Sequence, residues 1–590
     1  MKLTPLSKIL IVALIAGGLG LFLYKNRESI APSAKKEVTS NIPPPASLPD
    51  VAVSGAPSKG VGVAAEPAGC TDKPEVRFYI WAWNAQSGLI LANGGKQATA
   101  NSLMCKNGVN LKLIREDNTD NMQALMMTFG EKLKAGEAQP KEGAHFVAIM
   151  GDGSANFLKG LNDRLRKIGD DYMAIVVGSA GYSRGEDKFM GPPEWKANPQ
   201  AAKGGLVAGY LRDGDWNIAL KWLGDNRIAN NPDESTYDPD ALNWVGASDY
   251  LDAGEKYISG FCTDLKNVKT GKKEKHCVQG VVTWTPGDVN VAQKKGGLVS
   301  IVSTKEYRSQ MPNVIIGHKK WMEANRELVK GMLKATFDGG DLIKADPANL
   351  QKAAALSALV YNEQDGAYWA KYFNAMVEKD KQGLDVELGG SSVNNLADNL
   401  QTFGLVPGSS NLFATTYEVF ATIVKSQYPD LLPSWYPAAQ ITDTSYIKEL
   451  SAANAPVTAP DVPKFEPAEK VKTVVSRRSW QIEFESGKAQ FTKSADAELR
   501  KLLDDTLIAG GTMIEVHGHT DNQGTIESNM TLSEERAFAV KTWLEKQSPA
   551  NFPEGRVKVF SHGQAEPVAP NASTEGRAKN RRVEIVMGVQ

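Results

Sequence analysis

The sequence predicts an α/β protein with an apolar N-terminal segment, a large α/β block and a smaller C-terminal α+β block. Short apolar strands alternate with amphipathic helices through the large block, which is typical of α/β folds. Two proline-rich segments separate the parts. The 590 residues carry a formal net charge of -1 and are 42% hydrophobic. This composition excludes a generally basic nucleic-acid-coating protein, a disordered chain and a polytopic membrane protein.

The first element is an apolar run, residues 9–24, with Lys8 before it and Lys25 after it. It is slightly shorter than the ~20 residues that cross a bilayer, but the flanking lysines can snorkel to the membrane surface. A cleavable signal peptide is the alternative, although no small-residue cleavage site follows the run directly. We therefore expect residues 1–30 to be an uncleaved inner-membrane anchor, with cleavage and release into the periplasm as the alternative.

Proline, alanine and serine dominate two stretches, residues 31–74 and residues 451–475. Proline-rich chains adopt extended, semi-rigid conformations of ~3.1 Å per residue, so both stretches are expected to be linkers. They leave a central block at 75–450 and a C-terminal block at 476–590. No repeat of fixed period is visible, which excludes solenoids and propellers.

The cysteine count indicates the compartment. The chain has four cysteines and no C-x-x-C pair, so a redox motif is not indicated. Cys262 and Cys277 flank a lysine-rich hairpin tip containing Gly271, and a bridge there would stabilise the fold by ~3 kcal/mol in the chain-entropy model. Zinc binding that includes His276 is the less favoured reading. The disulfide candidates are Cys70, Cys105, Cys262 and Cys277, whose connectivity the sequence leaves open, and paired disulfides imply an oxidising compartment, here the periplasm.

The central block predicts parallel sheets in two lobes, because a single sheet of this length is not expected. The strand candidates are residues 76–83, 109–116, 145–151, 172–179, 205–211, 243–247, 281–285 and 298–303. The helix candidates are residues 121–136, 217–226, 249–261 and 319–337.

Four segments of this block carry a family resemblance: VRFYIWAWNAQSG, HFVAIMGDGSANF, YMAIVVGSAG and VVTWTPGDVNVAQKKGG. Their layout resembles that of the periplasmic substrate-binding proteins of ABC importers, in the branch that handles nitrate, sulfonates and taurine. The resemblance implies a periplasmic-binding-protein fold, in which two lobes close around a solute delivered to an ABC permease.

Ligands of such sheets bind where strands end and helices begin. Small polar residues and aromatic rings at these strand ends give the candidate solute contacts Trp83, Asn84, Ser87, Asp152, Ser154, Ser179, Tyr182, Thr285 and Asp288. Helix N-termini at Ser87 and Ser154 favour an anionic solute. Asp152 and Asp288 would repel an anion, so the identity of the solute stays open.

The C-terminal block predicts the element order β-α-β-α-β. An alternating strand covers Ser479–Glu485, a helix covers about Ser494–Leu507 and a strand covers Met513–His519. A second helix opens at Leu532, and a loop leads to a final strand.

A spaced set of residues then identifies a second resemblance. It comprises Thr520-Asp521, Gly524, Asn529, Leu532-Ser533, Arg536-Ala537, Gly563, Pro567, Asn571, Gly576-Arg577-Ala578 and Asn580 to Glu584. The set resembles the signature of OmpA-like peptidoglycan-binding domains and covers roughly residues 480–587. Glu485 departs from it, because the family more often has Asp there.

This second resemblance implies recognition of diaminopimelate in the peptidoglycan stem peptide, whose side chain carries an ammonium and a carboxylate. Asp521 and Arg536 are expected to converge on one pocket as the fixed anion and cation, since an arginine fork pairs bidentately with a carboxylate. Asn529 is expected to order the loop or to donate to the ligand, beside Thr520.

Other charged residues of the block have structural interpretations. Arg577, Arg581 and Arg582 are interpreted as framework or a solvated basic edge. His517 and His519 share one strand face but lack a nearby Cys or Glu in ligand spacing, so packing is favoured over a metal pair.

The sequence thus favours a periplasmic solute-binding protein that is anchored to the inner membrane and to peptidoglycan and serves an ABC importer. The alternative is a cell-envelope scaffold whose central module binds a protein partner. No nucleophile–base set is spaced for catalysis, so neither an enzyme, a cofactor nor a metal is predicted.

Overall fold

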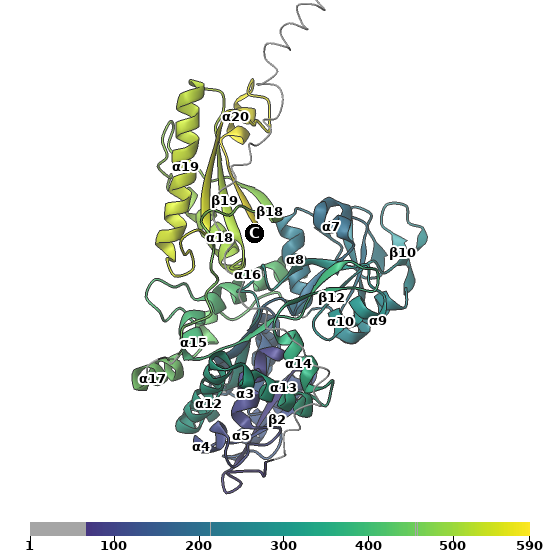
Figure 1. Cartoon of the computed structure of the whole chain (residues 1–590), viewed down its shortest axis with the longest axis vertical. Helices are drawn as coiled ribbons and strands as arrows, with labels where there is room; N and C mark the ends of the chain where they lie inside the picture. Colours follow the sequence, from purple (N-terminus) through teal and green to yellow (C-terminus); the bar gives the residue numbers. More distant parts are fainter. Residues whose placement is uncertain (1–65, 213, 455, 457, 590) are drawn as a thin grey trace, which may run out of the picture. The chain divides into compact units, whose positions relative to one another are not determined.

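The computed structural model describes residues 66–212, 214–454, 456 and 458–589 (Figure 1). The expected membrane anchor and most of the first proline-rich segment lie outside the described residues. Within the described part of the chain, no helix combines the length and apolarity that crossing a membrane requires.

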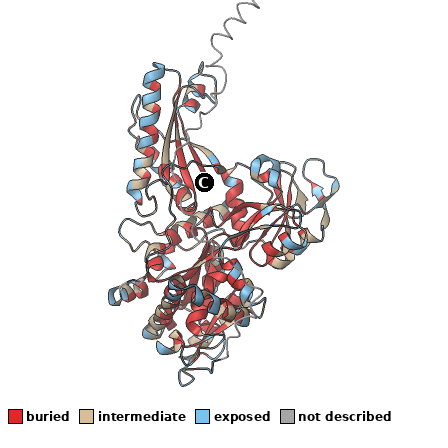
Figure 2. Cartoon of the chain, viewed as in Figure 1, coloured by how far each residue is buried: buried red, intermediate tan, exposed pale blue. Residues whose placement is uncertain are grey.

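Lobe 1 is built on a six-stranded sheet of order β17-β4-β14-β3-β1-β2. Its strands are β1 (Glu75–Ile80), β2 (Asn110–Arg115), β3 (Phe146–Met150), β4 (Ala174–Ser183), β14 (Pro312–His318) and β17 (Ser391–Val393). Its helices are α3 (Ser87–Asn93), α4 (Leu103–Lys106), α5 (Thr119–Lys134), α6 (Ser154–Leu165), α11 (Lys319–Ala324), α12 (Arg326–Ala345), α13 (Pro347–Tyr361), α14 (Gly366–Phe373), α15 (Leu396–Thr402), α16 (Leu412–Gln427) and α17 (Ser445–Ala453). Every residue of β3, β4 and β14 is buried, as Figure 2 shows.

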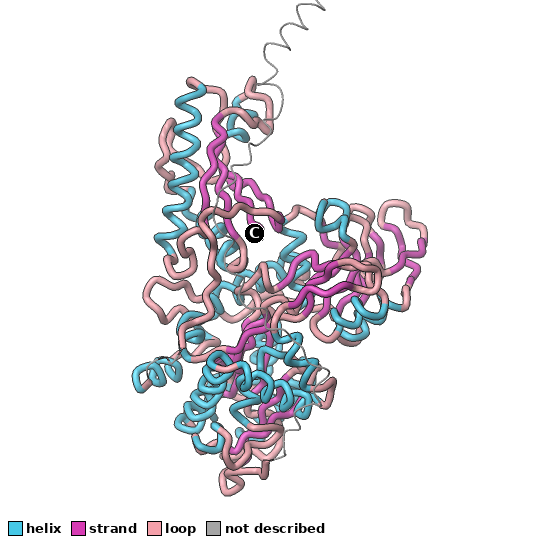
Figure 3. The backbone as a smooth tube through the Cα atoms, in the orientation of Figure 1, coloured by secondary structure: helices cyan, strands magenta, loops and turns pink. Residues whose placement is uncertain are grey.

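Lobe 2 is built on a second six-stranded sheet of order β13-β5-β12-β6-β9-β7. Its strands are β5 (Lys188–Gly191), β6 (Leu206–Gly209), β7 (Ala229–Asn230), β9 (Ala241–Gly246), β12 (Gly280–Thr283) and β13 (Val299–Ser303). Its helices are α7 (Pro193–Ala197), α8 (Gly214–Asp225), α9 (Tyr250–Ile258) and α10 (Gly287–Lys294), which Figure 3 shows beside the strands. Two small sheets complete the two lobes, one of β8 (Thr236–Tyr237), β10 (Cys262–Asn267) and β11 (Lys273–Cys277) and one of β15 (Met376–Lys379) and β16 (Asp385–Leu388).

The chain crosses between the two large sheets at residues 184–187 and again at residues 304–311. The two crossings are hydrogen-bonded together, because the Thr304 hydroxyl accepts from the Gly185 amide (2.8 Å) and contacts the Ser183 hydroxyl (2.6 Å). This double crossing is the physical basis of a two-lobed fold.

All eight strand candidates of the central block overlap observed strands, but the expectation of parallel sheets is confirmed only in part: β1 pairs in parallel with β2 and β3, and β6 pairs in parallel with β9 and β12, whereas other pairs are antiparallel. β14 runs antiparallel to both β3 and β4, and β5 runs antiparallel to both β12 and β13. The cause is the double crossing. The first strand after each crossing, β5 in lobe 2 and β14 in lobe 1, runs in the opposite direction to its neighbours.

The C-terminal domain is a four-stranded sheet of order β18-β21-β19-β20 with three helices. Its elements are β18 (Thr473–Trp480), α18 (Ala495–Ile508), β19 (Met513–His519), α19 (Ile526–Gln547), β20 (Val557–Gly563), α20 (Thr574–Asn580) and β21 (Val583–Val589). The order is therefore β-α-β-α-β-α-β, which corrects the expected β-α-β-α-β. β20 escapes the sequence pattern because five of its seven residues are only half-buried, so apolar alternation is weak.

Helix α19 also begins earlier than expected, at Ile526 rather than at Leu532. Its N-cap is Thr525, which forms a reciprocal capping box with Ser528. Two disulfides are present, Cys70–Cys105 and Cys262–Cys277. The second joins facing residues of the β10–β11 hairpin, which confirms the expected bridge.

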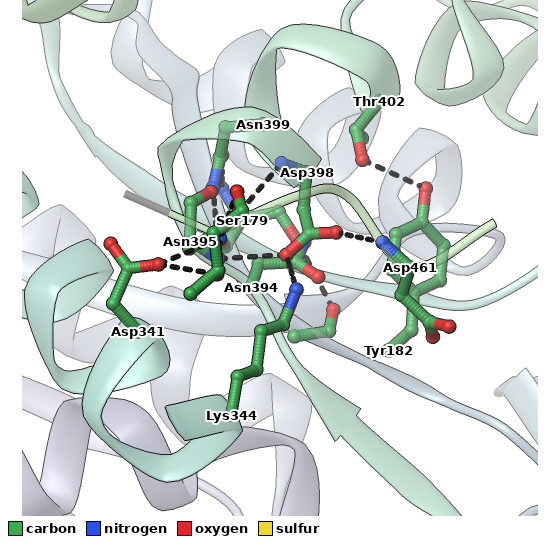
Figure 4. A network of polar contacts seen from close by, with 12 residues as sticks. Ser179, Tyr182, Asp341, Lys344, Asn394, Asn395, Asp398, Asn399, Thr402 and Asp461 are labelled. Carbon is green, nitrogen blue, oxygen red and sulfur yellow. Dashed lines mark hydrogen bonds and ion pairs between the residues drawn. The ribbon is translucent and has the colours of Figure 1, made fainter. Parts of the chain in front are cut away.

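The second proline-rich segment is hydrogen-bonded to lobe 1. The Asp461 amide donates to Asp398 on α15 (2.7 Å), and the Thr458 hydroxyl donates to Asp341 on α12 (2.6 Å). Figure 4 shows the contact between Asp461 and Asp398. Asn395 also donates to Thr458. The segment therefore follows the surface of lobe 1 rather than projecting freely.

Helix α18 of the C-terminal domain contacts α8 of lobe 2 through a buried lysine. The Lys221 ammonium pairs with Asp225 one turn along α8 (3.1 Å) and with Asp505 of α18. The Tyr307 hydroxyl donates to Asp225 from the second crossing (2.5 Å). Two backbone bonds join that crossing to the C-terminal domain, from Ser309 N to residue 508 and from residue 511 N to residue 306.

We expect Lys221→Ala to lower the free energy of unfolding by about 3–5 kcal/mol, because it leaves two carboxylates buried without their cation. Urea or thermal denaturation of the full chain measures the effect. Lys501→Ala, at an exposed lysine of α18, is the matched control and should stay within about 0.5 kcal/mol of wild type. Equal stability of the two variants would contradict the role given to Lys221.

Candidate functional site

The C-terminal domain contains a cavity of about 270 Å³ between β19, α19 and the segment that follows β18. Its lining residues are Gln481, Ile482, Glu483, Phe484, Thr492, His519, Arg536, Ala578, Arg581 and Arg582. Three guanidinium groups and one carboxylate share this lining, so the cavity favours a ligand with a negatively charged group.

Arg536 enters the cavity from α19. Its Nε donates to the carbonyl of Lys488 (3.1 Å), and its guanidinium carbon lies 5.1 Å from the centre of the Phe484 ring. Burial, together with the nearby Arg581, lowers the pKa of Arg536. The side chain remains a cation at neutral pH, because the ordinary pKa of arginine exceeds 12. It is therefore a buried positive charge with unused donor capacity.

Asp521 is paired with Arg581 rather than with Arg536. The Arg581 Nη1 donates to Asp521 Oδ2 (2.6 Å), and the Gln523 amide donates to Oδ1 (3.0 Å). Asp521 and Arg536 were expected to converge directly on one pocket. In the structure Arg581 lies next to both of them. The interpretation of Arg581 as a framework or solvated residue missed this contact, because the pairing joins residues 60 positions apart.

Asn529 and Thr520 hold the loop between β19 and α19. The Asn529 amide donates to the Asp521 carbonyl (3.2 Å) and to Gln564 (2.7 Å). The Thr520 amide donates to the Gly563 carbonyl (2.8 Å), whereas its hydroxyl is buried without a partner among the described residues. The geometry of Asn529 corresponds to the loop-ordering role.

A second group of polar residues is buried between the two lobes. The chain crossing at 184–187 contributes Glu186 and Asp187, and α8 contributes Asp215 at its first turn. All three side chains are buried. These acids were not among the sequence candidates: Glu186 and Asp187 lie in the crossing between β4 and β5, and Asp215 lies in the first turn of α8.

The buried acids are strongly perturbed. Burial raises the pKa of Glu186 well above its usual range, and the neighbouring Asp187 adds to the effect. The Ser391 hydroxyl donates to one Glu186 oxygen, while the other has no partner among the described residues. Burial also raises the pKa of Asp187 to about 6, which a hydrogen bond with Asp215 offsets only in part.

Four predicted solute contacts keep unused polar atoms in the described part of the chain. They are Trp83 Nε1, both amide atoms of Asn84, Ser87 Oγ and Thr285 Oγ1. All four residues are fully buried or nearly so. Because buried polar groups normally have partners, this concentration of unpaired groups favours a bound ligand.

Three other predicted contacts are held by the protein itself. The Asp288 carboxylate pairs with Lys188 (2.6 Å) and accepts the amides of Val289 and Gly389. Asp152 accepts from Gln310 (2.7 Å), and the Ser154 hydroxyl donates to the carbonyl of residue 151.

Ser179 and Tyr182 belong to a different site. Ser179 accepts from the Asn394 amide (2.9 Å) and Tyr182 donates to Thr402 (3.2 Å), both within the network under α15 shown in Figure 4. The sequence placed them with the solute contacts because the register of β4 is not visible in the chain. Their role as solute contacts stays a prediction, since these hydrogen bonds give each hydroxyl a partner within the protein.

The two lobes contact each other across the buried polar group. The Trp284 indole of lobe 2 donates to the Ala82 carbonyl of lobe 1 (3.4 Å) and stacks on Tyr250, with ring centres 3.8 Å apart. The Asn217 amide of α8 donates to the Asp152 carbonyl (3.3 Å). The unpaired polar atoms thus lie near a closed interface between the lobes.

Comparison with solved structures gives a match over the two lobes. The alkanesulfonate-binding protein SsuA from Xanthomonas axonopodis pv. citri, bound to MOPS, is 14% identical with a TM-score of 0.39. The match covers 65% of this chain and 100% of that chain.

Two curated relatives match the C-terminal domain. Outer membrane porin F of Pseudomonas aeruginosa is 38% identical over 110 residues, which is 19% of this chain and 31% of the porin. The peptidoglycan-associated lipoprotein of the same species is 41% identical over 81 residues, which is 13% of this chain and 45% of the lipoprotein. The chain thus spans less than half the length of either relative. The OmpA family model matches residues 483–581, so this part of the chain is an OmpA-family domain.

Proposed function

We propose that the protein is a periplasmic solute-binding protein fixed to the peptidoglycan layer, and that it acts by binding rather than by catalysis. The proposed organisation is a membrane anchor or signal segment at 1–30, a linker at 31–74, a two-lobed solute-binding domain at 75–450, a linker at 451–475 and a peptidoglycan-binding domain at 476–590. Residues 9–24 would hold the chain in the inner membrane. An ABC permease is the proposed recipient of the solute.

The proposed binding of peptidoglycan rests on one observation, the cavity that contains Arg536 and Arg581. Diaminopimelate offers a carboxylate that a guanidinium fork binds bidentately. Its ammonium would lie toward Asp521, whose second oxygen faces the Gln523 amide. The peptidoglycan-associated lipoprotein is among the relatives of this domain, which supports the same assignment.

The polar groups between the lobes favour a solute that carries a cationic or hydrogen-bond-donating group. One Glu186 oxygen has no donor among the residues that the structure describes, and the nearby Lys188 is already paired with Asp288. An anionic solute, the first candidate from the helix N-termini, would face carboxylates at this position. A small amine or polyol satisfies Glu186 and the Asn84 amide together.

A scaffold that binds a protein partner is the second candidate. It is favoured by the contact between Trp284 and Ala82, which closes the lobes on each other. A small molecule should stabilise the lobes of a solute-binding protein but not those of a scaffold.

Removing the cavity cation tests the peptidoglycan half. Arg536→Ala should weaken co-sedimentation of the full chain with purified peptidoglycan by about 10- to 100-fold, because a charged hydrogen bond contributes about 1.5–3 kcal/mol. Asp521→Ala should have a similar effect through the loss of its pairing with Arg581. Arg500→Ala, at an exposed arginine of α18, is the control. Sedimentation like wild type in both cavity variants would rule out the assignment.

A thermal-shift panel tests the solute half. Small amines, polyols and anions are added separately to the full chain, and a solute at 100 times its Kd should add ~2.7 kcal/mol to the free energy of unfolding. We expect the responses among amines or polyols, and weaker responses in Glu186→Gln. Stabilisation by anions alone would contradict the proposed solute chemistry, and no response from any class would favour the scaffold.

The perturbed acid predicts a pH dependence of stability. Asp187 has a folded pKa of about 6 against an ordinary value of 3.8. Between these values the folded chain holds the proton that the unfolded chain releases, so the free energy of unfolding falls as the pH rises from about 4 to about 6. Asp187→Asn removes this loss and should gain on the order of 2–3 kcal/mol over wild type at pH 7, but little at pH 4. A difference that is constant from pH 4 to pH 7 would contradict the raised pKa.

A further inference from the structure

Three histidines and two glutamates form a row on one face of the C-terminal sheet. His517 and His519 lie on β19, His562 lies on the neighbouring edge strand β20, and Glu566 follows that strand. The strand register shifts between Gly518 and His519, which inserts one extra residue into β20. Such bulges re-aim a side chain, and here the shift lies beside His562.

The three contacts along this row need one more proton than two neutral imidazoles carry. Glu515 lies 3.3 Å from His517 Nε2, His517 Nδ1 lies 2.8 Å from His562 Nε2, and His562 Nδ1 lies 3.1 Å from Glu566 Oε1. Two neutral imidazoles supply two N–H groups for these three contacts. One contact therefore joins two acceptors unless a third proton or a metal cation occupies it.

His519 adds a ligand that the protein leaves unused. Both of its ring nitrogens lack a partner among the described residues, although the residue is only 2% exposed. Its ring stacks on His562 with centres 4.7 Å apart, and ligand atoms of His519, His562 and Glu566 all lie within 4.8 Å of one another.

We propose that His519, His562 and Glu566 bind a divalent transition-metal ion, with Zn²⁺ the best fit. Two imidazole nitrogens and a carboxylate oxygen suit zinc, whose Zn–N and Zn–O distances of ~2.0–2.1 Å place tetrahedral ligands about 3.3 Å apart. The contact of 3.1 Å between His562 and Glu566 already has this spacing. Three protein ligands leave a fourth position for water.

The rest of the row then supports the metal. With His562 Nδ1 bound to the ion, His562 Nε2–H donates to His517, and His517 Nε2–H donates to Glu515. Every contact in the row is then satisfied. This carboxylate–histidine–histidine chain fixes the tautomer of the metal ligand, as outer carboxylates do at zinc sites. The nearby Arg582 opposes a cation, but Glu566 and Glu584 act on it with the opposite charge.

Metal binding to the full chain tests this proposal. The chain is treated with a chelator and then dialysed against Zn²⁺ at pH 7.5, and bound zinc is measured per chain. We expect one bound zinc that is lost in His519→Gln and in His562→Gln. His276→Gln is the matched control, because His276 lies on the β10–β11 hairpin, stacked on Tyr237. Co²⁺ in place of Zn²⁺ should give the absorption of a tetrahedral site in wild type.

A third variant protects the test against misfolding. Glu566 has an exposed side chain, so Glu566→Gln should fold normally and weaken zinc binding about tenfold or more. Zinc stoichiometry and affinity unchanged in all three variants would overturn the proposal, as would the absence of bound zinc in wild type. If wild type binds no zinc, the contact that two neutral imidazoles leave without a proton is made by a third proton rather than by a metal ion.

Discussion

Compensation of buried charge is the constraint on which this structure depends. Lys188 and Lys221 are fully buried and each is neutralised by aspartates, so they hold elements together. Arg536 and Glu186 are also buried, but their nearest partners are neutral groups or like charges. An uncompensated charge in low dielectric is unfavourable, so Glu186 holds its proton through a raised pKa, and a complementary ligand group would stabilise the Arg536 cation further. Structural and functional charges in the chain can be separated on this basis.

Much of the C-terminal domain could be predicted from the sequence, because its motif has fixed spacing. The strand at residues 513–519 was located correctly, and residues 483–581 match the OmpA family. The partner of Asp521 could not be predicted, since Arg581 reaches it only when β21 lies beside β19. The histidine row was missed for the same reason: its two strands are neighbours only in the folded sheet. Contacts between strands therefore set the limit of prediction here.

The lobes illustrate a different limit. Apolar runs located every strand predicted for the lobes, and the rule that ligands bind at strand ends selected Asn84 and Thr285, whose buried polar atoms lack partners among the described residues. The same rule selected Tyr182, but it could not predict that the Tyr182 hydroxyl donates to Thr402, because the direction of a side chain depends on strand register. It missed Glu186, which lies in the chain crossing and follows no periodic pattern. The crossings are set by topology, and topology is not visible in local hydrophobic periodicity.

The backbone bonds from residues 306 and 309 to the C-terminal domain have a thermodynamic consequence. Those residues belong to the crossing about which the two lobes would rotate. A rotation that strains these bonds changes the free energy of both the lobes and the domain that carries Arg536. Such coupling is reciprocal: if the proposed solute changes the proposed attachment to peptidoglycan, that attachment changes the affinity for the solute by the same factor. Under the proposed function, attachment to peptidoglycan would then change the solute concentration at which the lobes respond.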